Sequence, residues 1–163
     1  GICTPTKPSC LICPLRSLCS AFAHGGEQYA QTLPRKEPKK PKPIRLGKVF
    51  WIKDPEGRVF LRRRPERGLL GGLLEFPSTA WREGEAGALS EAPLDLRWQS
   101  VGPVPRHTFT HFHLELEAYR AVLSDPKRLD NQPDAQWAQI QTLDQIDALG
   151  LPTLMAKVAK ACL

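Results

Sequence analysis

The order of apolar and polar residues predicts a mixed domain of strands and helices after the first quarter of the chain. Two continuous apolar runs, residues 49–52 and 59–61, are separated by Asp54-Pro-Glu-Gly57, whose residues are typical of a turn, so we expect a β-hairpin there. Residues 107–122 are expected to form one strand, or two strands joined by a turn. A last helix is expected over residues 152–161.

Shorter helices are expected at three other places. One would cover residues 15–22, include Cys19 and end at Gly25-Gly26, because paired glycines stop helices. Residues 86–92 are a second candidate, and the sequence Thr-Leu-Asp-Gln at 142–145 is a capping-box pattern that marks a third. Together with the strands, these elements predict an α+β domain of about 117 residues, which is large enough for one core.

The basic residues are concentrated at the N-terminal end. The first 46 residues carry eight Lys or Arg and two acidic residues, so the whole formal net charge of +6 lies there. Prolines between residues 34 and 45 exclude a helix or a central strand and, with the like charges, predict a stiff connector. We therefore place a linker at 27–46, between a cysteine-bearing module at 1–26 and a compact domain at 47–163. A basic segment suits contact with nucleic acid, but for residues 34–45 alone a solvated linker is the better interpretation.

Composition argues against a disordered or membrane-spanning chain. Charged residues make up 25% and apolar residues 41%, which is ordinary globular composition. No apolar run approaches the roughly 20 residues that cross a bilayer. The chain opens with Gly1 and not with Met, so we expect it to be a piece of a longer protein.

Four of the five cysteines lie within 17 residues, in the spacing C-x6-C-x2-C-x5-C: Cys3, Cys10, Cys13 and Cys19. Packing in a hydrophobic core does not easily explain four thiols so close in sequence. Disulfides need an oxidising compartment, and nothing in the sequence argues for one. Metal ligation is the favoured interpretation. Structural zinc sites usually have two CxxC knuckles, but only one is present, and the spacing also departs from common ferredoxin runs. The fifth, Cys162, is expected to be a small buried hydrophobe.

This cysteine spacing resembles the [4Fe–4S] loop that closes the catalytic domain in the endonuclease III and MutY glycosylase families. Cys13-Pro14-Leu15 fits the same pattern. The resemblance implies a structural cluster held by the four cysteines and a loop whose basic residues, here Lys7 and Arg16, contact DNA phosphates. Fixed cations near the backbone of DNA neutralise phosphate charge, which agrees with that role.

The order of elements in the second module resembles the Nudix fold, and in more detail the Nudix-like C-terminal domain of MutY adenine glycosylases. The residues that carry this resemblance are Gly68-Leu-Leu-Gly-Gly-Leu73 with Glu75-Phe-Pro77, and Arg106-His-Thr-Phe-Thr-His-Phe-His-Leu114. It implies the C-terminal part of an adenine DNA glycosylase, which hydrolyses the N-glycosidic bond of adenine mispaired with 8-oxoguanine. The family's catalytic groups lie upstream of the cysteines, so no catalytic residue is assigned to this chain.

The same resemblance implies where the protein acts and on what. The expected partner is double-stranded DNA with 8-oxoguanine:adenine or guanine:adenine mispairs, bound by a monomer. We expect a DNA-associated location in a bacterial cytoplasm and no membrane partner.

Four side chains alternate between residues 107 and 113 and would share one face of a straight strand: His107, Phe109, His111 and His113. Phe112 and Leu114 would then face the core. The residues alone leave three interpretations open: an amphipathic strand, a His-x-His metal site, and nucleic-acid contact through an aromatic wedge.

The family resemblance favours nucleic-acid contact. In MutY proteins a Phe-Ser-His loop at this position recognises 8-oxoguanine, and Phe109-Thr110-His111 matches it. The resemblance implies that Phe109 intercalates beside the lesion and that His111 probes the lesion or holds the loop. Thr110 replaces the serine but keeps a hydroxyl that can donate or accept a hydrogen bond.

Two functions from other classes stay open. A Nudix-type nucleotide pyrophosphohydrolase would need clustered glutamates to hold Mg²⁺, but Arg82-Glu83 is not followed by the Glu-Glu pair of that motif. A zinc-stapled nucleic-acid-binding module without enzymatic function is the other alternative.

Overall fold

The computed structural model describes residues 1–37, 40–132 and 134–163, and the chain divides into two compact units, Gly1–Pro41 and Lys42–Leu163. Pro38 and Lys39 of the expected linker lie outside the described residues. No helix in the described ranges is long and apolar enough to cross a membrane.

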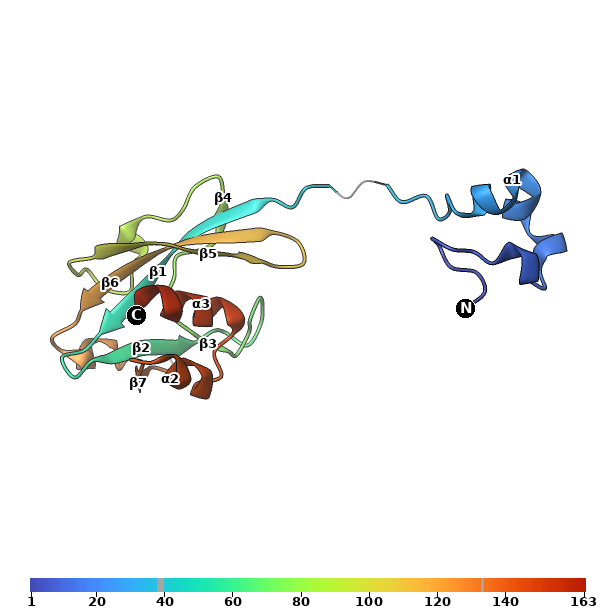
Figure 1. Cartoon of the computed structure of the whole chain (residues 1–163). Helices are drawn as coiled ribbons and strands as arrows, with labels where there is room; N and C mark the ends of the chain where they lie inside the picture. Colours follow the sequence, from blue (N-terminus) through green and yellow to red (C-terminus); the bar gives the residue numbers. More distant parts are fainter. Residues whose placement is uncertain (38–39, 133) are drawn as a thin grey trace. The chain divides into compact units, whose positions relative to one another are not determined.

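The N-terminal unit consists of two 3-10 turns, η1 (Cys10–Ile12) and η2 (Arg16–Leu18), and one helix, α1 (Ser20–Ala30) (Figure 1). The helix predicted over residues 15–22 was wrong, because α1 begins only after Cys19, whose backbone is extended at φ −83° and ψ 110°. The predicted stop at Gly25-Gly26 is a break within α1, since Gly26 has φ 66°, a left-handed conformation that favours glycine.

Between α1 and β1 the described residues hold neither helix nor strand, as the prolines require. The linker expected at 27–46 overlaps the last turn of α1 and the first residues of β1.

The described residues of the C-terminal unit form a mixed sheet of seven strands (Figure 1). The strands are β1 (Ile44–Lys53), β2 (Arg58–Arg63), β3 (Leu74–Glu75), β4 (Arg82–Glu83), β5 (Gln99–Thr108), β6 (His113–Val122) and β7 (Gln136–Gln139). Their order is β3-β2-β1-β6-β5, while β4 pairs with β1 and β7 with β2. β1 and β6 are parallel, with Ile44 opposite His113, and the other pairs are antiparallel.

The predicted hairpin is confirmed as β1 and β2. Its turn is held by Asp54, whose buried carboxylate accepts hydrogen bonds from the backbone N–H and the Nε of Arg58, both at 2.7 Å. The buried apolar side chains of this unit form two clusters, a larger one that we call the main core and a smaller second cluster. β1 is covered on both faces, because Val49 and Trp51 lie in the main core while Ile52 belongs to the second cluster. This double coverage explains why the strand is a continuous apolar run.

Two helices and two 3-10 turns complete this unit: α2 (Leu143–Ala148), α3 (Thr153–Cys162), η3 (Leu89–Glu91) and η4 (Pro126–Leu129). α3 packs on β5 and β6 and buries Leu154, Met155 and Val158 in the main core, which confirms the predicted last helix. The capping box at 142–145 is formed, and Cys162 is buried as predicted. The helix expected over 86–92 is reduced to the single turn η3. The fold is therefore α+β, as predicted.

Candidate nucleic-acid interface and cysteine pocket

The residues predicted to contact DNA lie in the turn between β5 and β6, residues 109–112, which we call the β5–β6 turn. Of the two predictions for residues 107–122, two strands joined by a turn is confirmed, so the four alternating side chains do not share the face of one straight strand. The Phe109 N–H donates to the Phe112 carbonyl at 2.9 Å. Phe112 and Leu114 are buried, as predicted, whereas Thr110 and His111 are exposed. The turn thus presents two polar side chains to solvent.

Phe109 is half-buried in a group of aromatic rings. Its ring centroid lies 4.6 Å from that of His107, 4.8 Å from that of Phe112 and 6.0 Å from that of Trp81. The guanidinium of Arg45 lies 4.4 Å from the Phe112 ring centroid. We call Trp81, His107, Phe109 and Phe112 the aromatic cluster. It holds the Phe109 ring beside the exposed part of the turn.

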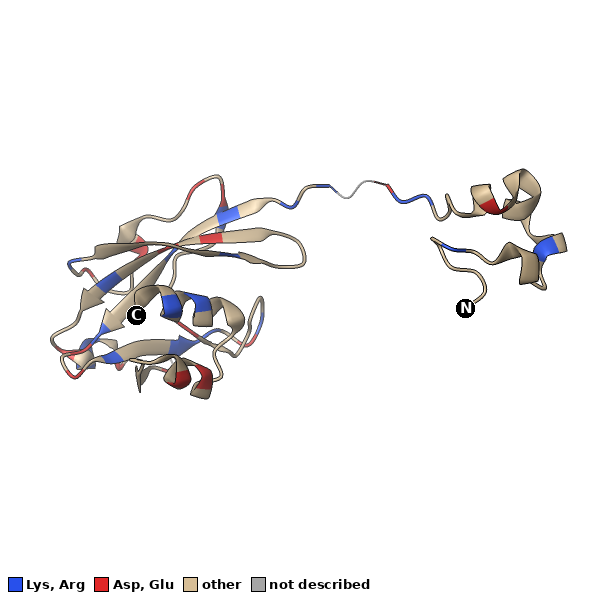
Figure 2. Cartoon of the chain, viewed as in Figure 1, with Lys and Arg blue, Asp and Glu red and all other residues tan. Residues whose placement is uncertain are grey.

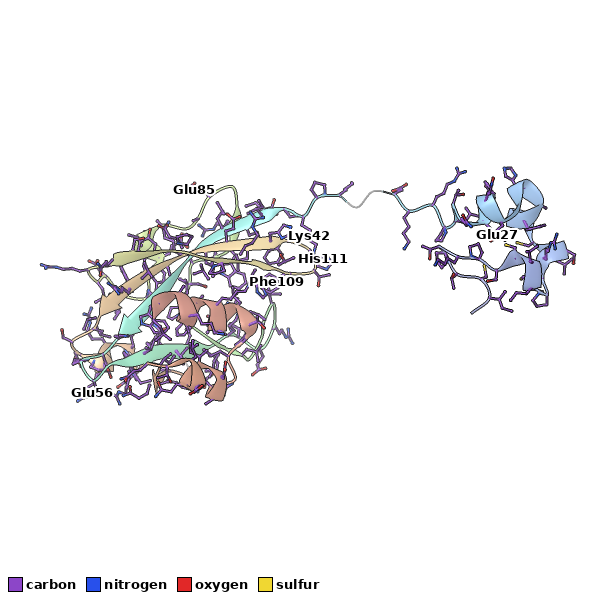
Figure 3. The ribbon with its side chains drawn as sticks, viewed as in Figure 1. Glu27, Lys42, Glu56, Glu85, Phe109 and His111 are labelled. Carbon is purple, nitrogen blue, oxygen red and sulfur yellow. The ribbon has the colours of Figure 1, made fainter. Side chains whose placement is uncertain are left out.

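The backbone of the β5–β6 turn is anchored from two directions. Lys42 donates from Nζ to the Phe109 carbonyl at 2.8 Å, and the Pro43 carbonyl accepts from the His113 N–H at 2.9 Å. Figure 3 shows Lys42, Phe109 and His111 at the same end of the sheet. From α3, Lys157 donates to the Arg106 carbonyl at 2.7 Å. The chain on both sides of the turn is therefore fixed.

His107 differs electrostatically from an exposed histidine. Burial, and after it the positive charge of Lys157, lower the pKa of its imidazole below the ordinary value of 6.5. The ring is therefore neutral at pH 7 and contacts Phe109 edge-on as an aromatic side chain.

A polar pocket of about 340 Å³ is lined by Trp81 of the aromatic cluster and by three arginines and one glutamate, Arg45, Arg62, Arg64 and Glu75. The buried carboxylate of Glu75 accepts a hydrogen bond from Arg62 Nε at 3.0 Å and another from Arg64 Nη1. Arg64 also donates from Nε to the Leu69 carbonyl at 2.9 Å. Arg64 thus ties the Gly68–Leu73 loop to β3, whereas the bond from Arg62 joins β2 to β3.

Sequence reasoning did not single out Lys42, Arg45 or Trp81. Each lies at least 28 residues before Phe109. Lys42 and Trp81 contact Phe109, and Arg45 contacts Phe112, only because the sheet brings these segments together. No spacing in the sequence could have linked them to the turn. Figure 2 shows basic and acidic residues interspersed over this unit, which agrees with the equal numbers of basic and acidic residues in 47–163.

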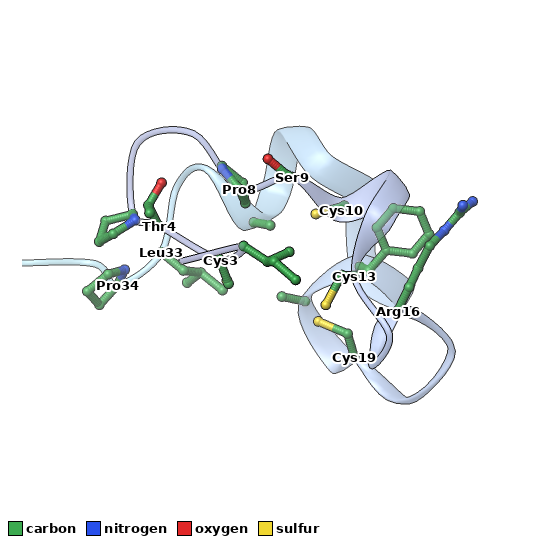
Figure 4. Close-up of a pocket in the computed structure, with 15 residues that line it drawn as sticks. Cys3, Thr4, Pro8, Ser9, Cys10, Cys13, Arg16, Cys19, Leu33 and Pro34 are labelled. Atoms are coloured by element: carbon green, nitrogen blue, oxygen red, sulfur yellow. The ribbon is translucent and has the colours of Figure 1, made fainter.

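The four clustered cysteines line one pocket of about 470 Å³ in the N-terminal unit (Figure 4). Cys10 is buried, Cys13 and Cys19 are half-buried, Cys3 is exposed, and all are free thiols. Burial first, then the negative charge of Glu27 and of the other three cysteines, raises the pKa of the Cys10 thiol. Four soft sulfur donors around one pocket fit an iron–sulfur cluster in type and number.

The described residues contain no group of three or more His, Cys, Asp or Glu side chains placed so that they could hold a metal ion as they stand. Of the predicted phosphate contacts, Lys7 is exposed, and the Arg16 guanidinium lies 4.5 Å from the Phe22 ring centroid.

Comparison with known proteins adds independent information. A family model described as "NUDIX domain" matches residues 48–161. Human adenine DNA glycosylase is 28% identical over 210 residues, which cover 96% of this chain and 38% of the human protein. The chain therefore spans about two-fifths of the length of this curated relative.

Two solved structures are similar to the C-terminal unit. The C-terminal domain of mouse MUTYH, crystallised in complex with human PCNA, superposes with a TM-score of 0.56 and 27% identity over 72% of this chain and 86% of that chain. A MutT protein from Methanosarcina mazei Go1 gives a TM-score of 0.52 over 75% of this chain and 94% of that chain. At 16% identity, this second likeness is one of fold alone.

Proposed function

This chain belongs to the NUDIX domain family, and we propose that it is the C-terminal part of an adenine DNA glycosylase that removes adenine mispaired with 8-oxoguanine. The extent of the similarity supports this most strongly. The match to the NUDIX model begins only at residue 48. The similarity to the human glycosylase covers 96% of the chain and therefore extends into the cysteine-bearing segment. A free-standing Nudix hydrolase does not account for that extension.

The task of this part is to recognise the lesion. The whole enzyme would flip adenine out of the duplex and hydrolyse its N-glycosidic bond with groups upstream of this chain. The exposed Thr110 and His111 can exchange hydrogen bonds with the N7 proton and the C8 oxygen that distinguish 8-oxoguanine from guanine. Phe109 would wedge beside the lesion with the part of its ring that the aromatic cluster leaves exposed.

The N-terminal unit would hold a [4Fe–4S] cluster through Cys3, Cys10, Cys13 and Cys19. When bound, the cluster supplies a rigid covalent centre for a loop that buries little apolar surface. The exposed Leu11 and Leu18 show how small the core of this unit is. In a fixed loop, Lys7 and Arg16 would neutralise DNA phosphates. The partner we propose is duplex DNA with 8-oxoguanine:adenine or guanine:adenine mispairs, bound by a monomer in the cytoplasm.

The proposal is tested in the full-length enzyme by measuring adenine excision from 8-oxoguanine:adenine and guanine:adenine duplexes. Phe109→Ala and His111→Ala are each expected to lower the preference for 8-oxoguanine about tenfold, because each removes contacts worth about 1–2 kcal/mol. Leu143→Ala, which shortens an apolar side chain that is 55% exposed on α2, is the control and leaves the preference unchanged.

Two results would contradict the proposal. One is an unchanged preference in both variants of the turn. The other is Mg²⁺-dependent release of phosphate from oxidised nucleoside triphosphates by this chain, which would favour a Nudix hydrolase.

A further inference from the structure

Trp81 is placed against the β5–β6 turn by the sheet and not by its own neighbours in sequence. It directly precedes β4, which pairs with the start of β1 at Arg45 and Leu46. Its ring lies on Gly47 of β1, where an added Cβ would stand 2.9 Å from Trp81 Cδ1. The absence of a side chain at Gly47 therefore leaves the space that the indole occupies.

The indole ring of Trp81 links two partners. The guanidinium of Arg64 lies 4.9 Å from the Trp81 ring centroid, and the Phe109 ring stacks on Trp81 at an interplanar angle of 26°. Arg64 is itself ion-paired with the buried Glu75, so this side of the stack is rigid. The Phe109 ring is thus held by Trp81 from outside the turn, in addition to its contact with Phe112 within the turn.

Lys42 acts on the same residue through the backbone. Its side chain is exposed, yet its ammonium group donates to the Phe109 carbonyl, and the next residue, Pro43, accepts from the His113 N–H. Within the β5–β6 turn, the described structure contains one backbone hydrogen bond, which the Phe109 N–H donates to the Phe112 carbonyl. An external bond to the carbonyl of Phe109 therefore constrains the peptide that leads to Thr110.

We infer that Trp81 and Lys42 are positioning residues for lesion recognition: Trp81 holds the ring of Phe109, and Lys42 holds its carbonyl. Together they direct Thr110 and His111 towards the DNA without touching it themselves. This inference rests on the proposed function of the β5–β6 turn.

The test measures the preference for 8-oxoguanine over guanine in the full-length enzyme, with Phe109→Ala as the reference variant. Trp81→Leu is expected to lower the preference about threefold to tenfold, because it removes the free energy of one aromatic stacking contact. Trp81→Phe should restore most of the preference. Trp98→Leu is the matched control, because Trp98 is also half-buried but packs at a tilt against Phe50. It should lower the melting temperature without changing the preference.

A second pair of variants avoids any loss of core packing. Lys42→Met is expected to lower the preference about twofold to fivefold, since it removes one charge-assisted hydrogen bond, and Lys42→Arg to retain it. Lys40→Met removes the same charge two residues away, where the described structure shows no hydrogen bond from that side chain.

The outcomes separate this inference from the proposed function. If Phe109→Ala lowers the preference but Trp81→Leu and Lys42→Met do not, the positioning role is refuted and the lesion-reading turn stands. Should Trp98→Leu or Lys40→Met lower the preference as much as its counterpart, the positioning role is likewise refuted. If Phe109→Ala itself has no effect, the assignment of the turn fails, and the inference fails with it.

Discussion

A single carboxylate fixes the turn that joins β1 to β2. Burial alone would raise the pKa of Asp54, but its hydrogen bonds and ion pair with Arg58 outweigh burial, so the pKa is lowered from 3.8. The carboxylate is therefore charged in the folded domain at neutral pH. A lowered folded pKa stabilises the fold above the unfolded pKa, and this stability is lost as pH falls through the folded pKa.

Replacing Asp54 with Asn should lower the free energy of unfolding by about 2 kcal/mol at pH 7, because a charged acceptor of two hydrogen bonds is lost. The difference from the wild type should shrink as the pH falls below about 4, because Asp54 then takes up a proton more readily in the unfolded wild-type chain than in the folded domain. Urea denaturation at pH 7 and pH 3 measures both values. Glu56→Gln is the control, since Glu56 pairs with Arg58 on the exposed surface. An equal difference at both pH values would contradict this account.

Among the elements, those with local signals were predicted well. The β1–β2 hairpin, the capping box of α2 and the apolar stripe of α3 each depend on residues within one turn or one helix. The helix expected over residues 15–22 failed because Cys19 is extended and α1 begins after it, which no local propensity indicated. Two strands joined by a turn was one of the two predictions for residues 107–122 and is confirmed, but the turn could not be placed in advance, because residues 109–112 carry neither Gly nor Pro.

The start of α2 gives a test of local prediction at this scale. The Gln145 N–H donates to Thr142 Oγ1 at 3.4 Å, and Gln145 Oε1 accepts from the Thr142 N–H at 3.2 Å. Thr142→Ala should therefore lower the free energy of unfolding by about 1 kcal/mol in urea. Thr153→Ala is the matched control at the start of α3, where no side chain caps the helix. Equal losses in the two variants would show that the cap adds no stability.

The candidate site was predictable only in part. Phe109, Thr110 and His111 stand together in the sequence, so a family resemblance could identify them. Their supports could not be found in this way, because Lys42 lies 67 residues from Phe109 and reaches it through the pairing of β1 with β6. Contacts of this kind exist only once the sheet has formed.

At the scale of the whole molecule, each unit has buried residues of its own. The main core and the second cluster consist entirely of residues from the C-terminal unit. All four tryptophans of the chain also lie in that unit. Intrinsic tryptophan fluorescence therefore reports the unfolding of the C-terminal unit alone. The cysteine pocket lies wholly within the N-terminal unit.

Because the cysteine pocket and the main core lie in different units, we expect a pocket variant, Cys13→Ser, and a core variant, Cys162→Ser, to change different signals. Cys13→Ser should abolish the visible absorbance of the proposed cluster and leave the fluorescence-monitored melting temperature unchanged. Cys162→Ser should lower the melting temperature and leave the visible absorbance unchanged. Burial raises the pKa of the Cys162 thiol to about 12, and its side chain packs in the main core, where a hydroxyl loses solvation. Visible absorbance and fluorescence melting of the chain spanning residues 1–163 measure both effects. Loss of both signals in either variant would contradict the separation.

The parallel pairing of β1 with β6 also bears on how the domain is made. A ribosome completes β1 and β2 long before it reaches His113, so the apolar run at 49–52 emerges with one edge of its strand unpaired. Closing so long a loop is entropically costly and slows folding, and an open apolar edge can pair with other chains in the meantime. A chaperone that shields nascent strands should therefore raise the yield of this domain more than that of a helical domain of equal length.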